Sequence, residues 1–266
     1  MTFALTGCPP KETAKEEPKV ETPPQPTEFK KTGSPDMYFR AASLDLKSFP
    51  RKIEMKDIER FAARMKKEKI DILAVQTIVR YPDLKERIDV FEELGRKTEM
   101  YKIFGETIAL SGRQIGNAVF SSYPIRSNDN VPYKNLKSTN LESAMVALVD
   151  AGTRPLLVVS TRIPDNASER EVLSCLKTIA LQKKNFKDTP IAIFGNIIKP
   201  KKLQELEGVD EPLEYNILTW EKSKETKKIP LWFSSVELQP INSTIIETDL
   251  GLTLITEFKL AGQPAQ

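Results

Sequence analysis

The chain has 266 residues, 39% of them hydrophobic, which suffices for one large domain with a tail or for two small domains. Its net charge of +3 comes from 40 basic and 37 acidic residues, a balance that does not indicate a nucleic-acid-binding protein. Histidine is absent, which removes the most common general base and metal ligand and leaves carboxylates and lysine for catalysis. The two cysteines are too few for a disulfide framework or a zinc site.

The first element along the chain is the short sequence LTGC, Leu5 to Cys8. It resembles the bacterial lipoprotein box, in which a leucine, two small residues and a cysteine end a signal peptide. The resemblance implies that Cys8 is lipidated and that the protein is anchored to a membrane on the extracytoplasmic side of a bacterial cell envelope. Only seven residues precede Cys8, too few for a complete signal peptide, which indicates a misassigned or truncated start. The alternative is a disordered tail with a chance four-residue match.

A proline-rich segment follows. Seven of the nineteen prolines lie between Pro9 and Pro35, among alternating lysines and glutamates and few apolar residues. Such a segment buries too little surface to offset its ordering entropy, so we predict an extended tether. We therefore divide the chain into a signal remnant (1–8), a tether (9–36), a folded domain (37–262) and a tail (263–266).

The folded domain alternates short apolar runs with amphipathic helices. Residues 54–68 place their large apolar side chains on one helical face (Met55, Ile58, Phe61, Ala62, Met65). We predict helices at 54–68, 83–97 and 168–186, and strands at 38–46, 71–79, 116–121, 143–149, 156–162, 190–194, 231–235 and 252–260. This order favours an α/β domain with covered sheets. In the third helix Cys175 shares a face with Val172 and Ile179, so we expect a buried, unreactive cysteine.

Seven segments resemble, in order, the endonuclease/exonuclease/phosphatase superfamily. GRQIGNAVFSSYPI (112–125) is the most similar, and the others are 40–46, 71–77, 155–163, 190–196, 229–235 and 247–260. The resemblance implies a four-layer α/β sandwich of two packed, mainly antiparallel or mixed sheets flanked by helices. Members of that superfamily hydrolyse phosphodiesters or phosphomonoesters with a divalent metal ion.

Most residues at the functional positions of that superfamily are changed here. Asp45 stands for an asparagine, Thr77 for the metal-binding glutamate and Arg162 for a histidine. The Asp-x-Asn pair is replaced by Asn196 and Ile198, one aspartate by Pro230, and the histidine of the terminal Asp-His pair by Leu250. Asp249 and Asn117 are retained, although Asn117 also suits a turn or strand start.

These changes remove the expected chemistry. Magnesium needs carboxylate oxygens in a near-octahedral array, and Thr77 is a neutral, poor ligand. Asn196 does not accept a proton usefully, and Arg162 stays charged and cannot shuttle one. We therefore predict no catalytic residues, no metal cofactor and a binding role in the cell envelope.

Three alternatives remain open at this stage. In the first, Arg162, with Asn117 and Asn196, binds an anion such as a phosphorylated head group. In the second, Arg162 pairs with Asp45 or Asp249 and fills the cleft, and an envelope protein binds elsewhere. A third hypothesis is a rewired phosphodiesterase or phosphatase that holds Mg²⁺ or Mn²⁺ between Asp45 and Asp249. Nucleic-acid binding is not expected, because the basic stretches 199–202 and 222–228 lack interleaved aromatic residues and the second is interrupted by glutamate.

Overall fold

A computed structural model describes residues 34–48, 52–83, 86–134, 136, 142–183, 186, 189–197, 215–218, 231–235 and 237–262. Cys8, most of the tether, Ile198, Pro230, both basic stretches and the tail at 263–266 therefore lie outside the described residues. Within the described part, no helix combines the length and apolarity that crossing a membrane requires.

The first sheet holds both ends of the described domain. Its strand order is β11-β12-β1-β2-β4-β3, with β1 and β2 parallel and all other neighbours antiparallel. The parallel pair places the carboxyl ends of β1 and β2 at the same edge. The strands are β1 (Met37–Asp45), β2 (Ile72–Arg80), β3 (Tyr101–Leu110), β4 (Arg113–Ser121), β11 (Leu238–Thr248) and β12 (Gly251–Leu260).

The second sheet has the order β5-β6-β7-β8-β10-β9. Within this second sheet, β7 and β8 are parallel and the other described neighbours are antiparallel, and the β7–β8 register aligns Arg162 with Asn196 at the carboxyl ends. The strands are β5 (Ile125–Pro132), β6 (Ser143–Asp150), β7 (Pro155–Arg162), β8 (Ile191–Asn196), β9 (Tyr215–Leu218) and β10 (Leu231–Ser235).

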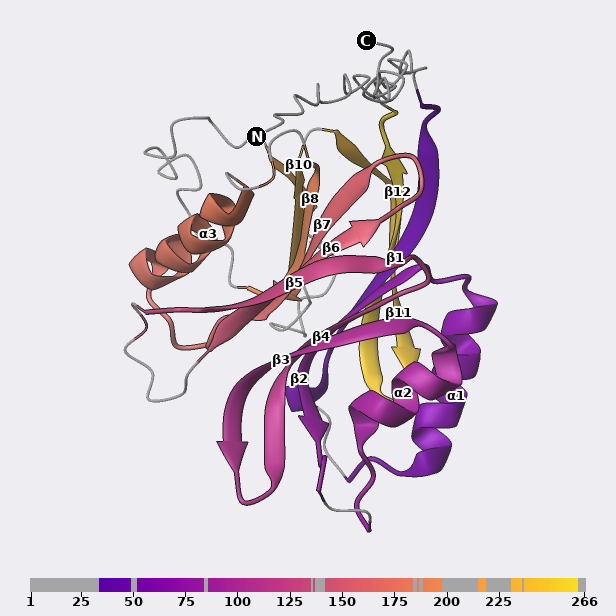
Figure 1. Cartoon of the computed structure of the whole chain (residues 1–266), viewed down its shortest axis with the longest axis vertical. Helices are drawn as coiled ribbons and strands as arrows, with labels where there is room; N and C mark the ends of the chain where they lie inside the picture. Colours follow the sequence, from indigo (N-terminus) through magenta and orange to yellow (C-terminus); the bar gives the residue numbers. More distant parts are fainter. Residues whose placement is uncertain are drawn as a thin grey trace, which may run out of the picture. The chain divides into compact units, whose positions relative to one another are not determined.

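The two sheets face each other, and helices cover both outer faces (Figure 1). An inter-sheet core joins Phe39, Ile72 and Phe258 of the first sheet to Met145 and Phe194 of the second. Helix α3 (Glu169–Lys183) covers the second sheet, and Cys175 is buried beneath it as predicted, only 3% exposed. The predicted four-layer α/β sandwich is confirmed.

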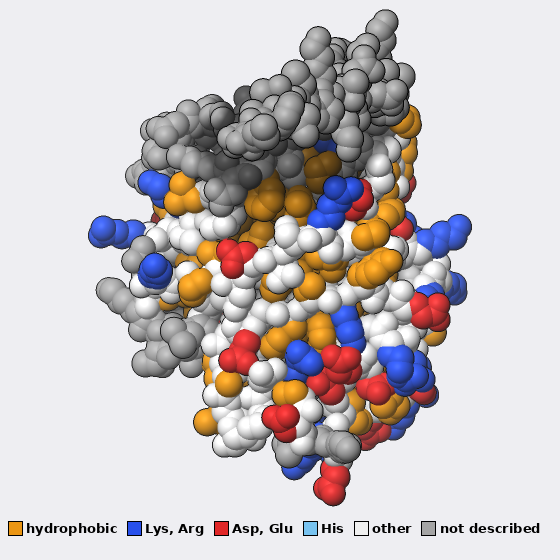
Figure 2. Space-filling model, viewed as in Figure 1, with side chains coloured by type: hydrophobic (Ala, Val, Ile, Leu, Met, Phe, Trp, Pro, Cys, Tyr) orange, Lys and Arg blue, Asp and Glu red, His pale blue; other side chains and the backbone are white. Residues whose placement is uncertain are grey.

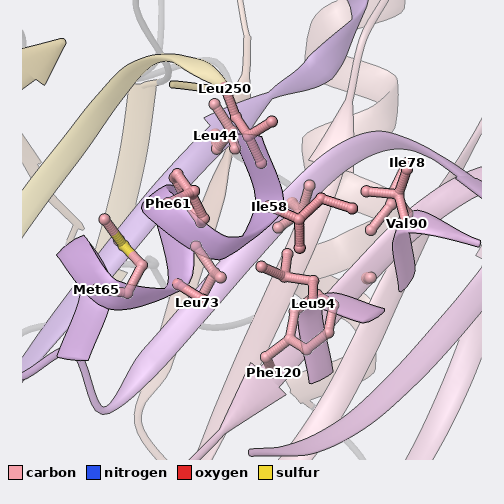
Figure 3. Close-up of a cluster of buried hydrophobic side chains, with 14 of the residues drawn as sticks. Leu44, Ile58, Phe61, Met65, Leu73, Ile78, Val90, Leu94, Phe120 and Leu250 are labelled. Atoms are coloured by element: carbon pink, nitrogen blue, oxygen red, sulfur yellow. The ribbon is translucent and has the colours of Figure 1, made fainter. Parts of the chain in front are cut away.

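Helices α1 (Met55–Lys67) and α2 (Val90–Thr98) cover the first sheet over a separate outer core. The side chains of Ile58, Phe61 and Met65 point from α1 into this core (Figure 3). The predicted apolar face of α1 is thus largely the buried one, although Met55 is only half-buried.

The second helix begins later than predicted. The apolar spacing suggested a start at 83, but α2 starts at Val90 and Ile88 precedes it. Asp89 explains the difference, because its carboxylate accepts the N–H of Glu92 at 3.0 Å and of Tyr81 at 3.2 Å. This N-cap satisfies the first turn and fixes the start of the helix.

Candidate functional site

The strand ends bring several of the predicted site residues to one edge of the sandwich. Asp45 ends β1 in the first sheet, and Arg162 ends β7 in the second. Thr77 follows Gln76, which the β1–β2 register places beside Asp45. Residues from both sheets therefore meet at this edge.

Arg162 lies at the centre of a buried charge cluster. Its Nε is 3.3 Å from Asp45 Oδ2, its Nη1 is 3.6 Å from Glu142 Oε1, and its Nη2 is 3.3 Å from Asp165 Oδ2. The side chains of Arg162 and Asp45 are only 5% and 7% exposed. These four residues are called the Arg162 cluster below. Of the two partners considered from the sequence, the structure pairs Arg162 with Asp45.

Both oxygens of Asp45 are engaged. Oδ2 faces Arg162, while Oδ1 accepts hydrogen bonds from the Thr77 hydroxyl at 2.9 Å and from the N–H of Lys47 at 3.0 Å. The carboxylate therefore has its partners within the protein, and a metal ion would have to displace them.

Thr77 has an unusual backbone conformation. Its φ is +56°, and the β2–β4 register shifts between Val75 and Ile78, so the strand bulges at this point. A β-branched residue rarely adopts the left-handed region, and such strain costs about 1–3 kcal/mol. Strain of this kind persists only where the surroundings impose it, and here the hydrogen bond to Asp45 holds the side chain.

Even together with Lys47, the Arg162 cluster carries no net positive charge. Burial raises the pKa of Glu142, Arg162 and Lys47 lower it, and Asp45 and Asp165 raise it further. Lys47 Nζ also lies 3.9 Å from Asp165 Oδ2. Three carboxylates thus surround two cations, which leaves no net positive charge to attract an anion to Arg162.

The two residues of the β11–β12 turn have partners outside the Arg162 cluster. Asp249 pairs with Arg60 of α1 at 3.5 Å. Leu250 is fully buried in the outer core, beside Leu44 (Figure 3). Leu250, which the resemblance predicts to replace the superfamily's histidine, is therefore a core side chain.

The two asparagines differ in what the structure shows. Asn117 is 2% exposed and donates to the carbonyl of Ser143 at 2.8 Å, which joins β4 to β6. That contact is structural. Asn196 ends β8 beside Arg162 in the strand register, and its side chain lies outside the described part.

A divalent metal does not fit the residues present at this edge. Among the described residues no group of three or more carboxylates or cysteines is arranged to hold a metal ion. Asp45 is engaged by Arg162 and Thr77, and Asp249 is paired with Arg60. The arrangement forms a closed ion-pair cluster instead.

Sequence reasoning missed two members of the cluster. Asp165 follows Arg162 by three residues, and this spacing just after a strand could have indicated that the two side chains pair. Glu142 precedes β6 and has no motif around it. Only the three-dimensional pairing of β6 with β7 brings it to Arg162.

Solved structures share the fold of this chain. An endonuclease/exonuclease/phosphatase from Beutenbergia cavernae DSM 12333 is 16% identical, with a TM-score of 0.65, over 84% of this chain and 72% of that one. A protein of the same description from Bacteroides vulgatus is 12% identical, with a TM-score of 0.64, over 84% and 99%. A family protein from Leptotrichia buccalis C-1013-b is 14% identical, with a TM-score of 0.62, over 82% and 98%.

No protein-family model matches the sequence, and no curated protein is similar to it. At identities this low the structural likeness defines the fold alone. The chain therefore has the endonuclease/exonuclease/phosphatase fold, and its activity has to be argued from its own residues.

Proposed function

We propose that this protein is a catalytically inactive member of the endonuclease/exonuclease/phosphatase superfamily that acts as a binding module in a bacterial cell envelope. The observation that carries the proposal is the Arg162 cluster. Arg162 neutralises Asp45, one of the two carboxylates that could hold a metal ion in the alternative hypothesis, at 3.3 Å.

The neighbouring positions support the same conclusion. Thr77 offers a hydroxyl where a metal-binding carboxylate is expected, and this hydroxyl donates to Asp45. Leu250 is a fully buried core residue at the position of a catalytic histidine. Loss of several such groups together leaves no metal ligand set among the residues that the structure describes, and it removes the histidine that would serve as general base.

Membrane tethering rests on the sequence alone. The LTGC box and the proline-rich segment occur together and in the order found in lipoproteins. A lipid on Cys8 would hold the domain near the membrane through the tether, with a second attraction needed for stable anchoring. Metabolic labelling with an alkyne fatty acid tests this, because Cys8→Ser abolishes the label if Cys8 is the acceptor.

Nucleic-acid binding is not part of the proposal. On the described part of the face in Figure 2, basic and acidic side chains are intermingled around α1, α2 and the β3–β4 hairpin. A surface of mixed sign provides little of the electrostatic attraction that phosphate backbones require.

Hydrolysis of bis-p-nitrophenyl phosphate by the full chain, with Mg²⁺ or Mn²⁺, tests the loss of catalysis. We expect no turnover above a buffer control. Metal-dependent turnover that disappears in both Asp45→Ala and Asp249→Ala would overturn the proposal in favour of a rewired hydrolase. Arg113→Ala, an exposed change at the tip of the β3–β4 hairpin, is the matched control.

A further inference from the structure

A small pocket lies next to the Arg162 cluster, between the segments that follow β1 and β2. Its volume is about 230 Å³, and Thr77 lines it. Since the Thr77 hydroxyl also donates to Asp45, one side chain separates the pocket from the cluster. The pocket wall is mainly apolar, with side chains from both segments and from the start of α2 (Leu46, Ile53, Val79, Ile88, Val90).

The polar side chains that line this pocket are cations and hydroxyls. Lys52 and Arg87 supply two cations, and Thr77 and Tyr81 supply two hydroxyls. None of the described residues that line it carries a carboxylate. It is called the Arg87 pocket below. An apolar wall with a few converging polar groups is the usual form of a small-molecule site.

Arg87 lines two pockets, and the charge of their lining residues determines which of them receives an anion. Arg87 also lines a second pocket of about 540 Å³, into which four carboxylates project (Glu86, Asp89, Glu92, Glu93). Three of these carboxylates already have cationic partners: Arg80 contacts Asp89 at 3.6 Å and Glu92 at 3.0 Å, Lys102 also contacts Glu92, and Arg96 contacts Glu93 at 2.5 Å. The second pocket therefore offers an anion no excess of positive charge, and the Arg87 pocket, lined by cations without carboxylates, is the more favourable side.

We propose that the Arg87 pocket binds a small amphiphilic anion, a phosphate or carboxylate group on a compact hydrocarbon body. The guanidinium of Arg87 suits either group, because its fork of donors matches two acceptor oxygens. The apolar wall takes the hydrocarbon. The volume is below the range of about 300–1,000 Å³ that drug-sized ligands occupy, so the body is short. Binding in the Arg87 pocket does not depend on the loss of catalysis proposed for the Arg162 cluster.

Calorimetric titration of the full chain with hexyl phosphate, in metal-free buffer, tests the proposal. We expect one-to-one binding with a negative heat-capacity change, since apolar surface is buried. Inorganic phosphate and hexanol, which each supply half of the ligand, should bind at least about tenfold more weakly. Hexanoate in place of hexyl phosphate then shows whether the site takes a carboxylate as well as a phosphate.

Two variants identify the site. Arg87→Glu reverses an exposed charge and should weaken hexyl phosphate binding by about tenfold or more, because it removes a charge-assisted contact. Arg113→Glu makes the same change on an exposed arginine at the β3–β4 hairpin and should leave the affinity unchanged. The proposal fails if hexyl phosphate does not bind, if inorganic phosphate binds equally well, or if the two variants have the same affinity. Because no metal and no hydrolysis assay is involved, these outcomes are independent of the test of catalysis.

Discussion

Arg162 Nε lies 3.3 Å from Asp45 Oδ2, and this ion pair joins the end of β7 in one sheet to the end of β1 in the other. From the sequence, both residues are predicted to stand at positions that serve catalysis in the superfamily that the sequence resembles. In this protein they neutralise each other across the sandwich. At this edge the ion pair forms a structural contact between the sheets.

Removing Arg162 should destabilise the domain strongly. Arg162→Met leaves Asp45 and Glu142 buried without their cation, and breaking a buried ion pair in this way costs about 3–5 kcal/mol. Arg126→Met is the matched control, because it breaks the exposed Arg126–Asp150 pair, whose loss costs about 0–1 kcal/mol. Urea unfolding measures both changes. Equal costs would show that the Arg162 cluster contributes no more than a surface pair.

The cluster should also give stability a characteristic pH dependence. Burial raises the pKa of Glu142 above its ordinary value of 4.5, so the folded state holds the proton more tightly than the unfolded state. Ionisation of Glu142 therefore lowers stability as pH rises above 4.5. In Glu142→Gln this loss is absent, so the unfolding free energy of the variant minus that of the wild type should increase from about pH 4 to pH 7.

Asp150 provides the control of opposite sign. A hydrogen bond from Arg126 lowers the pKa of Asp150 below its ordinary value of 3.8, so its contribution to stability is present above that pH and is lost as pH falls. The difference between Asp150→Asn and the wild type should become more unfavourable as pH rises to about 4. Unfolding curves across this range measure both variants, and slopes of the same sign would refute the assignment for Glu142.

Thr77 combines backbone strain with a hydrogen bond, and two variants separate these effects. Thr77→Val keeps the β-branched shape at φ +56° and removes the hydroxyl that donates to Asp45, so it should cost about 1–2 kcal/mol. Thr77→Asn tolerates the left-handed region and keeps a donor, so it should be at least as stable as the wild type. Thermal unfolding gives the order of the three proteins. A valine variant as stable as the asparagine variant would contradict this account.

Leu250 should behave as a core residue. Leu250→Ala opens a cavity in the outer core and should cost about 2–5 kcal/mol. Leu252, two residues further on and 39% exposed, is the matched control, and Leu252→Ala should cost much less. Chemical denaturation distinguishes them. Similar costs would mean that the turn does not anchor β12 to the outer core.

The buried strands could be predicted from the sequence and the edge strands could not. Eight strands with continuous or alternating apolar runs were identified within one to three residues of their observed ends. The four that were missed, β3, β5, β9 and β11, are the outermost strands of the two sheets. The physical reason is visible in β5, where exposed polar residues dominate, because an edge strand needs fewer apolar contacts and avoids aggregation with polar side chains.

The candidate site could be predicted in part from the sequence, for a similar reason. Asp45 and Arg162 end recognisable buried strands and Thr77 lies within a third, so their shared edge could be inferred from chain order. The sequence could not predict whether Asp45 and Asp249 would face each other, since the direction of the side chains in the β11–β12 turn depends on α1. In the structure Asp249 pairs with Arg60 of that helix at 3.5 Å.

The central claim is that the Arg162 cluster takes the place of a metal site. Titration of Mn²⁺ into the full chain, followed by electron paramagnetic resonance of the free ion, tests it most directly. The account predicts that the free Mn²⁺ signal matches that of buffer at every concentration. Stoichiometric loss of the free signal in the wild type, restored to the buffer level by Asp45→Ala but not by Asp150→Ala, would contradict it.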